Sequence, residues 1–210
     1  MRRIEPTMVR KGRSALIRFV GTIVRLSRCI LKPGPAPKPG YFCLRSSSIT
    51  SSAHWSRVRM VVLDVDGVLT DGKLYYASDG SITRAFNVHD GMGIVRALSS
   101  GIIVAALSGR DDPSVRRRMD ELGVELLGGS DDKLERYEDL LRKHGLKDEE
   151  VAYIGDDIND IPVMRRVGVP VAVADARPEV KAIASYVTHA KGGEGAVREV
   201  LDMVLNEKGA

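Results

Sequence analysis

Cysteine is scarce in this chain of 210 residues: the sequence has two, Cys29 and Cys43, and both lie before residue 59. Residues 59–210 therefore hold no disulfide framework, no thiolate metal site and no cysteine nucleophile. A chain of this kind suits a reducing compartment, so we expect a cytoplasmic protein.

A long uninterrupted hydrophobic stretch is also lacking. The longest one, Ala15–Leu31, is broken by Arg18, Arg25 and Arg28. A transmembrane helix needs about 20 largely apolar residues, so this segment is not a clean membrane span. Its apolar side chains instead fall on one side at 100° per residue, which predicts a basic amphipathic helix over residues 8–31.

Acidic residues are nearly absent from the first part of the chain. Residues 1–58 hold 12 Lys and Arg and a single acid, Glu5, whereas residues 59–210 hold 20 Lys and Arg and 27 Asp and Glu. The net charge of +4 thus conceals a basic extension and an acidic remainder. We expect no nucleic-acid binding by the larger part, because the positive charge lies outside it.

The basic extension ends in residues typical of loops and linkers. Lys32–Gly40 is rich in Pro and Gly and breaks any helix, and Ser46–Ser52 is rich in Ser and Thr. The Arg-rich composition is typical of an organelle transit peptide, but a membrane-surface helix and an upstream start site fit as well. We expect residues 1–57 to be disordered or helical and residues 58–210 to form the domain. Membrane contact or organelle targeting is expected only if the extension belongs to the native protein.

From residue 59 onward, short apolar runs alternate with segments of helical periodicity. This alternation predicts an α/β domain in which a parallel sheet carries helices on both faces. The predicted strands are residues 60–65, 102–107, 124–127, 151–154, 169–173 and 186–188, and the predicted helices are 90–100, 112–122, 131–144, 161–167, 178–184 and 194–206.

One stretch departs from the alternation. Two strand-like segments, 74–77 and 82–88, flank Ser-Asp-Gly and predict a β-hairpin flap near residues 73–88. About 41 residues separate Asp66 from Ser108. That spacing leaves room for the hairpin but none for a separate cap domain.

Polar side chains follow the predicted strands at the points where these end. In a parallel sheet the carboxyl ends of the strands meet at one edge, where ligands bind. We therefore expect one site built from Asp64, Asp66 and Gly67 after the first strand, Ser108, Gly109 and Arg110 after the second, Lys133 at a helix start, and Asp156, Asp157 and Asp160 after the fourth.

Neighbouring carboxylates at that edge need a cation. Two of them about 4 Å apart repel by roughly 4 kcal/mol at an effective dielectric near 20. Oxygen ligands without His or Cys favour Mg²⁺, which prefers a few carboxylates together with substrate phosphate. Lys133 and Ser108 would then hold phosphate oxygens, Asp64 would attack phosphorus, and Asp66 would transfer the proton.

Each of these residues also has a plainer interpretation. Asp-Gly after a strand is often only a turn, and Lys133 alone would be an exposed helix lysine. Asp131 and Asp132 fit helix N-caps better than ligands. The catalytic interpretation depends on the four segments occurring together and in order.

At these residues the sequence resembles the haloacid dehalogenase superfamily over about residues 59–207. The four segments match its motifs: Asp-x-Asp-Gly-x-x-Thr-Asp, a Ser or Thr, a Lys, and Gly-Asp-Asp-x-x-Asp. The resemblance implies that Asp64 is the nucleophile and Asp66 the acid/base. It also implies Mg²⁺ on Asp64, the Asp66 carbonyl and Asp156, with Asp157 or Asp160 orienting that shell.

A closer resemblance is to the family of 3-deoxy-D-manno-octulosonate 8-phosphate (KDO 8-phosphate) phosphatases. It is carried by Phe86–Ile94, Val151–Asp157, Val171–Ala176 and Gly192–Val200. The resemblance implies a capless homotetramer in lipopolysaccharide biosynthesis that acts on a small sugar phosphate. It implies substrate contacts, beyond Asp66, Ser108, Gly109 and Lys133, at Asn87, Val88, His89, Asp90, Gly91, Arg110 and Arg118.

Two positions depart from that family's pattern, since His89 and Val95 stand where arginine is often found. A phosphatase acting on a nine-carbon keto-deoxy sugar acid, or on another small sugar phosphate, is therefore the alternative. A catalytically idle scaffold is a further alternative, although every motif residue is present.

Overall fold

The computed structural model describes residues 18–19, 22–23, 54–129 and 132–209, and the chain divides into the units Met1–Ser47 and Ser48–Ala210. In the first unit β1 (Arg18–Phe19) pairs with β2 (Thr22–Ile23) in antiparallel fashion. The helix predicted over residues 8–31 is therefore not found at these four residues, and the rest of it lies outside the described residues. Among the residues described, no helix is long and apolar enough to cross a membrane.

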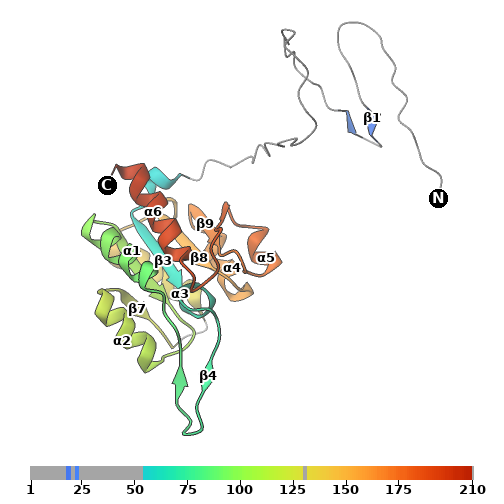
Figure 1. The fold of residues 1–210 in the computed structure, drawn as a ribbon. Coiled ribbons are helices and arrows are strands. Elements are labelled where there is room, and N and C mark those ends of the chain that lie inside the picture. Colours follow the sequence, from blue (N-terminus) through green and yellow to red (C-terminus); the bar gives the residue numbers. More distant parts are fainter. Residues whose placement is uncertain (1–17, 20–21, 24–53, 130–131, 210) are drawn as a thin grey trace, which may run out of the picture. The chain divides into compact units, whose positions relative to one another are not determined.

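The second unit is built on a parallel sheet (Figure 1). Its six strands lie in the order β10-β9-β8-β3-β6-β7, and every neighbouring pair is parallel. All five residues of the central strand β3 are buried, as expected for a Val-rich strand covered on both faces. The strands are β3 (Met60–Asp64), β6 (Ile103–Leu107), β7 (Glu125–Leu127), β8 (Val151–Gly155), β9 (Val169–Ala172) and β10 (Tyr186–Val187).

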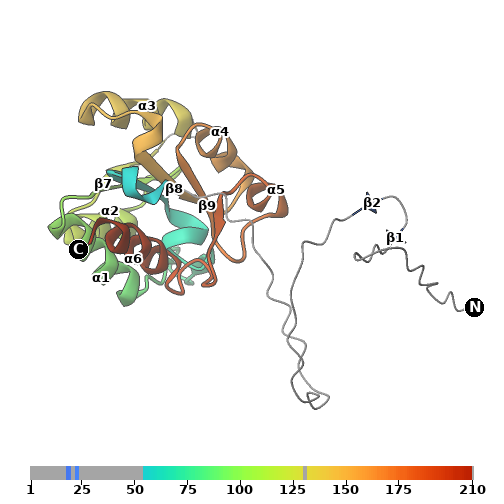
Figure 2. The same cartoon turned by 90° about the horizontal axis from the view of Figure 1, so that it is seen from above.

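Helices cover both faces of this sheet, which confirms the predicted architecture. Figure 2 shows α1, α2 and α6 on one face and α3, α4 and α5 on the other. The chain runs outward from β3 to β7 and then crosses to β8, so its direction reverses beside β3. Such a switch point opens a crevice at the carboxyl ends of the strands. The helices are α1 (Val88–Ser99), α2 (Pro113–Leu122), α3 (Lys133–His144), α4 (Ile161–Met164), α5 (Pro178–Lys181) and α6 (Ala196–Lys208).

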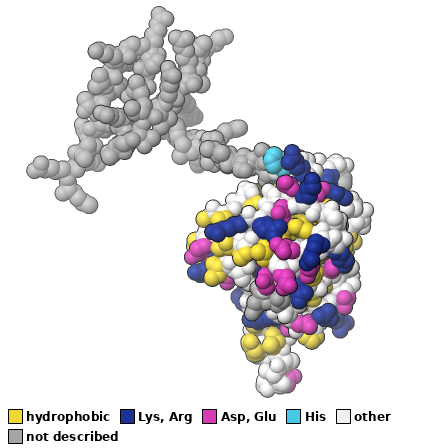
Figure 3. Space-filling model, turned by 180° about the vertical axis from the view of Figure 1, so that it is seen from behind, with side chains coloured by type: hydrophobic (Ala, Val, Ile, Leu, Met, Phe, Trp, Pro, Cys, Tyr) yellow, Lys and Arg dark blue, Asp and Glu magenta, His cyan; other side chains and the backbone are white. Residues whose placement is uncertain are grey.

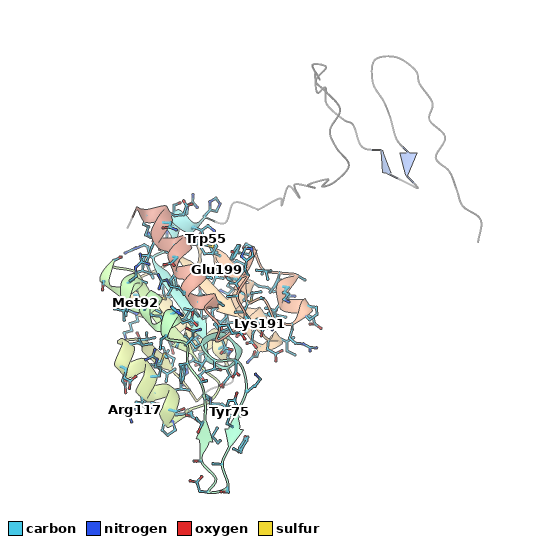
Figure 4. The ribbon with its side chains drawn as sticks, in the orientation of Figure 1. Trp55, Tyr75, Met92, Arg117, Lys191 and Glu199 are labelled. Carbon is cyan, nitrogen blue, oxygen red and sulfur yellow. The ribbon has the colours of Figure 1, made fainter. Side chains whose placement is uncertain are left out.

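The hydrophobic core extends past the predicted domain boundary. Trp55, only 8% exposed, belongs to the core, and its ring meets that of Tyr186 edge-on at 5.9 Å. Figure 4 shows Trp55 beside the end of the C-terminal helix. The packed unit therefore includes residues that the boundary at 57/58 assigned to the extension.

The hairpin is present but shorter than predicted. Its strands β4 (Tyr75–Tyr76) and β5 (Ile82–Thr83) pair in antiparallel fashion, and the hairpin projects from the domain (Figure 1). The second strand ends at residue 83, and Asn87 caps α1 by accepting the His89 N–H at 2.8 Å. Helix capping thus takes residue 88 out of the predicted strand.

Candidate active site

Strand register brings the predicted loops together at one edge of the sheet. Asp64 lies opposite Leu107 of β6, and Leu63 lies opposite Ile154 of β8. The residues that follow these strands therefore leave the sheet at the same level. The sequence correctly predicted that Asp64, Ser108 and Asp156 would share this edge.

The loop after β3 folds tightly around a glycine. Gly67 has φ = +100°, and a methyl group there would lie 2.1 Å from Oδ2 of Asp156. The hydroxyl of Thr70 accepts the N–H groups of Gly67 and Gly72, both at 3.3 Å. Only glycine permits this backbone conformation and this close approach of the loop to Asp156.

Four charged side chains form what we call the inner cluster: Asp64, Lys133, Asp156 and Asp160. The ammonium group of Lys133 donates to Oδ1 of Asp64 and to Oδ1 of Asp160, both at 2.7 Å. One oxygen from each of the three carboxylates lies within 4.8 Å of the others. Lys133 is 4% exposed, so it is not the surface lysine of the plainer interpretation.

Burial and mutual repulsion oppose ionisation of the aspartates in this cluster. Burial, followed by the charge of Asp160, raises the pKa of Asp64 well above its usual range. Burial also raises the pKa of Asp156 to about 6. Burial alone would lower the pKa of Lys133, but Asp64 and Asp160 outweigh it and raise that pKa. Lys133 is therefore a fixed cation that only partly balances its neighbours.

Asp160 is saturated with hydrogen bonds. Its Oδ1 accepts from Lys133 and from the hydroxyl of Tyr153, both at 2.7 Å, and its Oδ2 accepts the backbone N–H groups of Asp156 and Asp157 at 2.9 and 3.2 Å. Asp157 is exposed and caps the next turn through Ile158. Of the two residues between which the sequence left the orienting role open, Asp160 is the one hydrogen-bonded to Lys133 of the inner cluster.

The inner cluster fits a divalent cation. Oδ1 of Asp156 is buried and has no hydrogen-bond partner within the described part of the chain. Three carboxylates face one ammonium group, and the donors are all oxygen, which suits Mg²⁺. Asp64 and Asp156 would hold the ion together with the predicted Asp66 carbonyl.

Asp66 lies in a second group, which we call the outer cluster: Asp66, Arg84 and Asp112. The Arg84 Nε–H donates to Oδ1 of Asp66 at 2.8 Å, and Nη1 donates to Oδ2 of Asp112 at 2.5 Å. Asp112 caps α2 through Ser114, and these hydrogen bonds outweigh burial and lower its pKa to about 2. Arg84 was not predicted from the sequence, because an arginine at the end of a strand carries no local signal of its partners.

Several predicted substrate contacts lie around this edge. Ser108 is buried, and its hydroxyl accepts the Arg110 N–H at 3.2 Å across Gly109. Asn87 also donates through Nδ2 to the Gly193 carbonyl at 3.2 Å. Three of the predicted contact residues are exposed: Val88, His89 and Arg110.

Asp90 and Gly91, two further predicted substrate contacts, lie in the first turn of α1 and contact other parts of the protein. Asp90 is 1% exposed, and its Oδ1 accepts the Arg198 N–H at 2.8 Å at the start of α6. Its Oδ1 thus faces the first turn of α6, where unpaired N–H groups attract an anion. Its Oδ2 is buried and has no hydrogen-bond partner among the described residues. At Gly91 a methyl group would lie 2.4 Å from Nη2 of Arg118, so the glycine makes room for that guanidinium.

Comparison with known proteins places the fold and the site in context. A family model described as haloacid dehalogenase-like hydrolase matches residues 124–201. A 3-deoxy-D-manno-octulosonate 8-phosphate phosphatase of Salmonella typhi is 50% identical over 153 residues, which cover 72% of this chain and 81% of that protein. The Escherichia coli K12 protein of the same name is 46% identical over 168 residues, which cover 80% and 89%.

Solved structures of proteins with this name also resemble the chain in sequence and fold. The phosphatase of that name from Yersinia pestis is 46% identical with a TM-score of 0.73 and covers 74% of this chain and 84% of its own. The one from Moraxella catarrhalis, solved with magnesium, phosphate and KDO, is 39% identical with a TM-score of 0.71 over 73% and 88%.

The capless parallel sheet with its edge of aspartates defines a haloacid dehalogenase-type hydrolase. More narrowly, the chain belongs to the 3-deoxy-D-manno-octulosonate 8-phosphate phosphatase family, a family of phosphoric monoester hydrolases. Both predicted resemblances are thereby confirmed.

Proposed function

We propose that the protein hydrolyses KDO 8-phosphate to KDO and phosphate through an aspartyl-phosphate on Asp64. The observation that carries this proposal is the placement of the Asp64 carboxylate: Lys133 holds it at 2.7 Å, beside Asp156 and two residues before Asp66. The relatives' names and the neighbour solved with magnesium, phosphate and KDO support the substrate and the ion.

The proposed chemistry has two transfers. A carboxylate oxygen of Asp64 attacks phosphorus, the ester P–O bond breaks, and the carboxylic acid of Asp66 protonates the departing alkoxide. Water then attacks the phosphorus, Asp66 takes a proton from it, and phosphate leaves with Asp64 restored. Bound Mg²⁺ would screen the charge of the phosphate from Asp64 and Asp156. Lys133 and Ser108 would hold phosphate oxygens.

The test is phosphate release from KDO 8-phosphate with Mg²⁺ and with excess EDTA. A nine-carbon keto-deoxy sugar-acid phosphate and simple hexose phosphates serve as competing substrates. We expect KDO 8-phosphate to have the highest kcat/KM and EDTA to stop turnover. A higher kcat/KM for the nine-carbon substrate would show that this compound, and not KDO 8-phosphate, is the preferred substrate. Turnover that persists in EDTA would contradict the proposed requirement for Mg²⁺.

We also propose that the protein acts as a homotetramer. Apolar side chains are exposed on the hairpin and on the first turns of α1: Tyr75 is 50%, Tyr76 71%, Val88 73% and Met92 55% exposed. Figure 3 shows hydrophobic side chains on the projecting hairpin. Light scattering after size exclusion measures the assembly, and a monomer at micromolar concentration would contradict it.

A further inference from the structure

Arg84 is buried against a residue of the proposed reaction without being open to a substrate. Its side chain is 1% exposed, whereas that of its partner Asp66 is 29% exposed. A guanidinium so enclosed cannot meet a sugar phosphate unless the hairpin moves. The structure therefore separates the two residues: Asp66 faces solvent, and Arg84 holds it from behind.

The Arg84 side chain joins three segments that are distant in the sequence. It leaves the chain just after β5 of the hairpin, reaches Oδ1 of Asp66 in the loop after β3, and reaches Oδ2 of Asp112 at the start of α2. Asp112 is itself fixed, because its Oδ1 accepts the N–H and the hydroxyl of Ser114 at 2.8 and 2.6 Å. Arg84 is thus anchored at one end and holds Asp66 at the other.

Asp66 has little else to hold it. Arg84 provides the side-chain hydrogen bond that the structure shows for its carboxyl group within the described residues. The neighbouring Gly67 lies in a left-handed conformation, which turns the loop away after Asp66. A general acid must lie within about 3 Å of the oxygen that it protonates, so rotation of this carboxyl would misplace the proton.

We propose that Arg84 is a positioning residue, which fixes the carboxyl of Asp66 for proton transfer and in turn depends on Asp112. This inference rests on the proposed function, because it assigns Arg84 a part in the same reaction. Arg84 touches neither substrate nor metal in this scheme. A planar guanidinium can bond two carboxylates through different nitrogens at once, which the single nitrogen of lysine does less well.

The test compares esters whose leaving groups differ in their need for a proton. KDO 8-phosphate releases an alkoxide, which needs the proton of Asp66, whereas 4-nitrophenyl phosphate and acetyl phosphate release stable anions. The ratio kcat/KM reports the steps up to cleavage of the ester bond. For Arg84→Met we expect kcat/KM to fall about 10- to 100-fold on KDO 8-phosphate, less than the full 10²–10⁴-fold weight of general acid–base catalysis because Asp66 itself remains. On the activated esters the loss should be less than about threefold.

Two further variants complete the experiment. Arg84→Lys should restore part of the loss on KDO 8-phosphate, and it carries the test if Arg84→Met does not fold. Arg59→Met is the matched control, because Arg59 pairs with Glu150 at 3.0 Å with its side chain 59% exposed, just before β3 at the far end of the strand. This control should leave both activities unchanged.

The outcomes separate the inference from the proposed function. An equal loss on all esters in the Arg84 variants, or no loss at all, would overturn the positioning role. A wild-type protein that hydrolyses none of these esters with Mg²⁺ would overturn the proposed function itself.

Discussion

The inner and outer clusters lie side by side at one edge of the sheet but differ in how well their charges are matched. In the inner cluster three carboxylates share the single cation Lys133, and the pKa values of Asp64 and Asp156 rise. In the outer cluster two carboxylates share Arg84, and the pKa of Asp112 falls to about 2. Burial is the first cause of the rise in the inner cluster, where three carboxylates face one cation, so a further cation would be favourable there. In the outer cluster two carboxylates face one cation, and both are hydrogen-bonded to it.

The largest loss of activity is expected for a substitution at Asp64 in the inner cluster. Asp64→Asn should reduce phosphate release by at least about 10⁴-fold, because the amide cannot form the aspartyl-phosphate. In EDTA its melting temperature should equal or exceed that of the wild type. The pKa of Asp64 is raised in the folded state. At any pH above the pKa of the unfolded chain, this raised value lowers the free energy of unfolding, and Asn, which does not ionise, has no such cost.

Calorimetry in EDTA measures the melting temperature of this variant, and a phosphate assay in Mg²⁺ measures its activity. Each kcal/mol of relieved burial cost and repulsion should raise the melting temperature by about 2–4 °C in a domain of this size. A variant that is active would remove the nucleophile assignment. A variant that is inactive and much less stable would mean that Asp64 supports the fold.

A smaller loss is expected at Asp66. Asp66→Asn should lower kcat by about 10²–10⁴-fold, the usual weight of general acid–base catalysis. Its amide oxygen can still accept from Arg84, so the support should survive. The rise in melting temperature caused by Mg²⁺ should also persist, because the predicted contact is through the backbone carbonyl. A loss below about tenfold would mean that another group transfers the proton.

Thermal stabilisation by Mg²⁺ tests whether the inner cluster binds a cation. At Mg²⁺ concentrations about 100 times the dissociation constant, binding stabilises a protein by about 2.7 kcal/mol, which corresponds to roughly 5–10 °C here. Asp156→Asn should abolish most of that shift, since it removes a ligand whose Oδ1 is buried and unpartnered among the described residues.

The adjacent residue provides the control for this experiment. Asp157→Asn changes an exposed carboxylate one position away and should keep the Mg²⁺ shift. Differential scanning fluorimetry with and without Mg²⁺ compares the two variants. An equal shift in both would remove Asp156 from the metal site.

The inner cluster could be predicted from the sequence because its members follow a simple rule. Asp64 and Asp156 come directly after buried parallel strands, and Lys133 begins a helix, so topology alone places them at one edge. The alternation of strands and helices likewise predicted the sheet. Strand ends were less certain, because capping by Asn87 competes with the strand predicted to reach residue 88.

The outer cluster could not be predicted in the same way. The link between Asp66 and Arg84 depends on where a hairpin returns, which no short-range pattern determines. Asp90 illustrates a related difficulty, since a motif shows which residue is present but not which contacts its side chain makes. Its carboxylate turns to the first turn of α6, a contact across 108 positions.

The smallest expected effect tests whether the outer cluster is a matched support. Asp112→Asn keeps an acceptor for Ser114 but removes the charge beside Arg84, and should lower the free energy of unfolding at pH 6 by roughly 1 kcal/mol because the pair is partly exposed. The pKa of Asp112 is depressed, so the wild type's advantage is present above 3.8 and is lost as the pH falls toward about 2. Urea unfolding of both proteins at pH 6 and near pH 3 measures this difference. If the stability difference between wild type and variant grew on acidification, the pKa of Asp112 would be raised and not lowered. The outer cluster would then not stabilise its carboxylates, and the contrast with the inner cluster would be wrong.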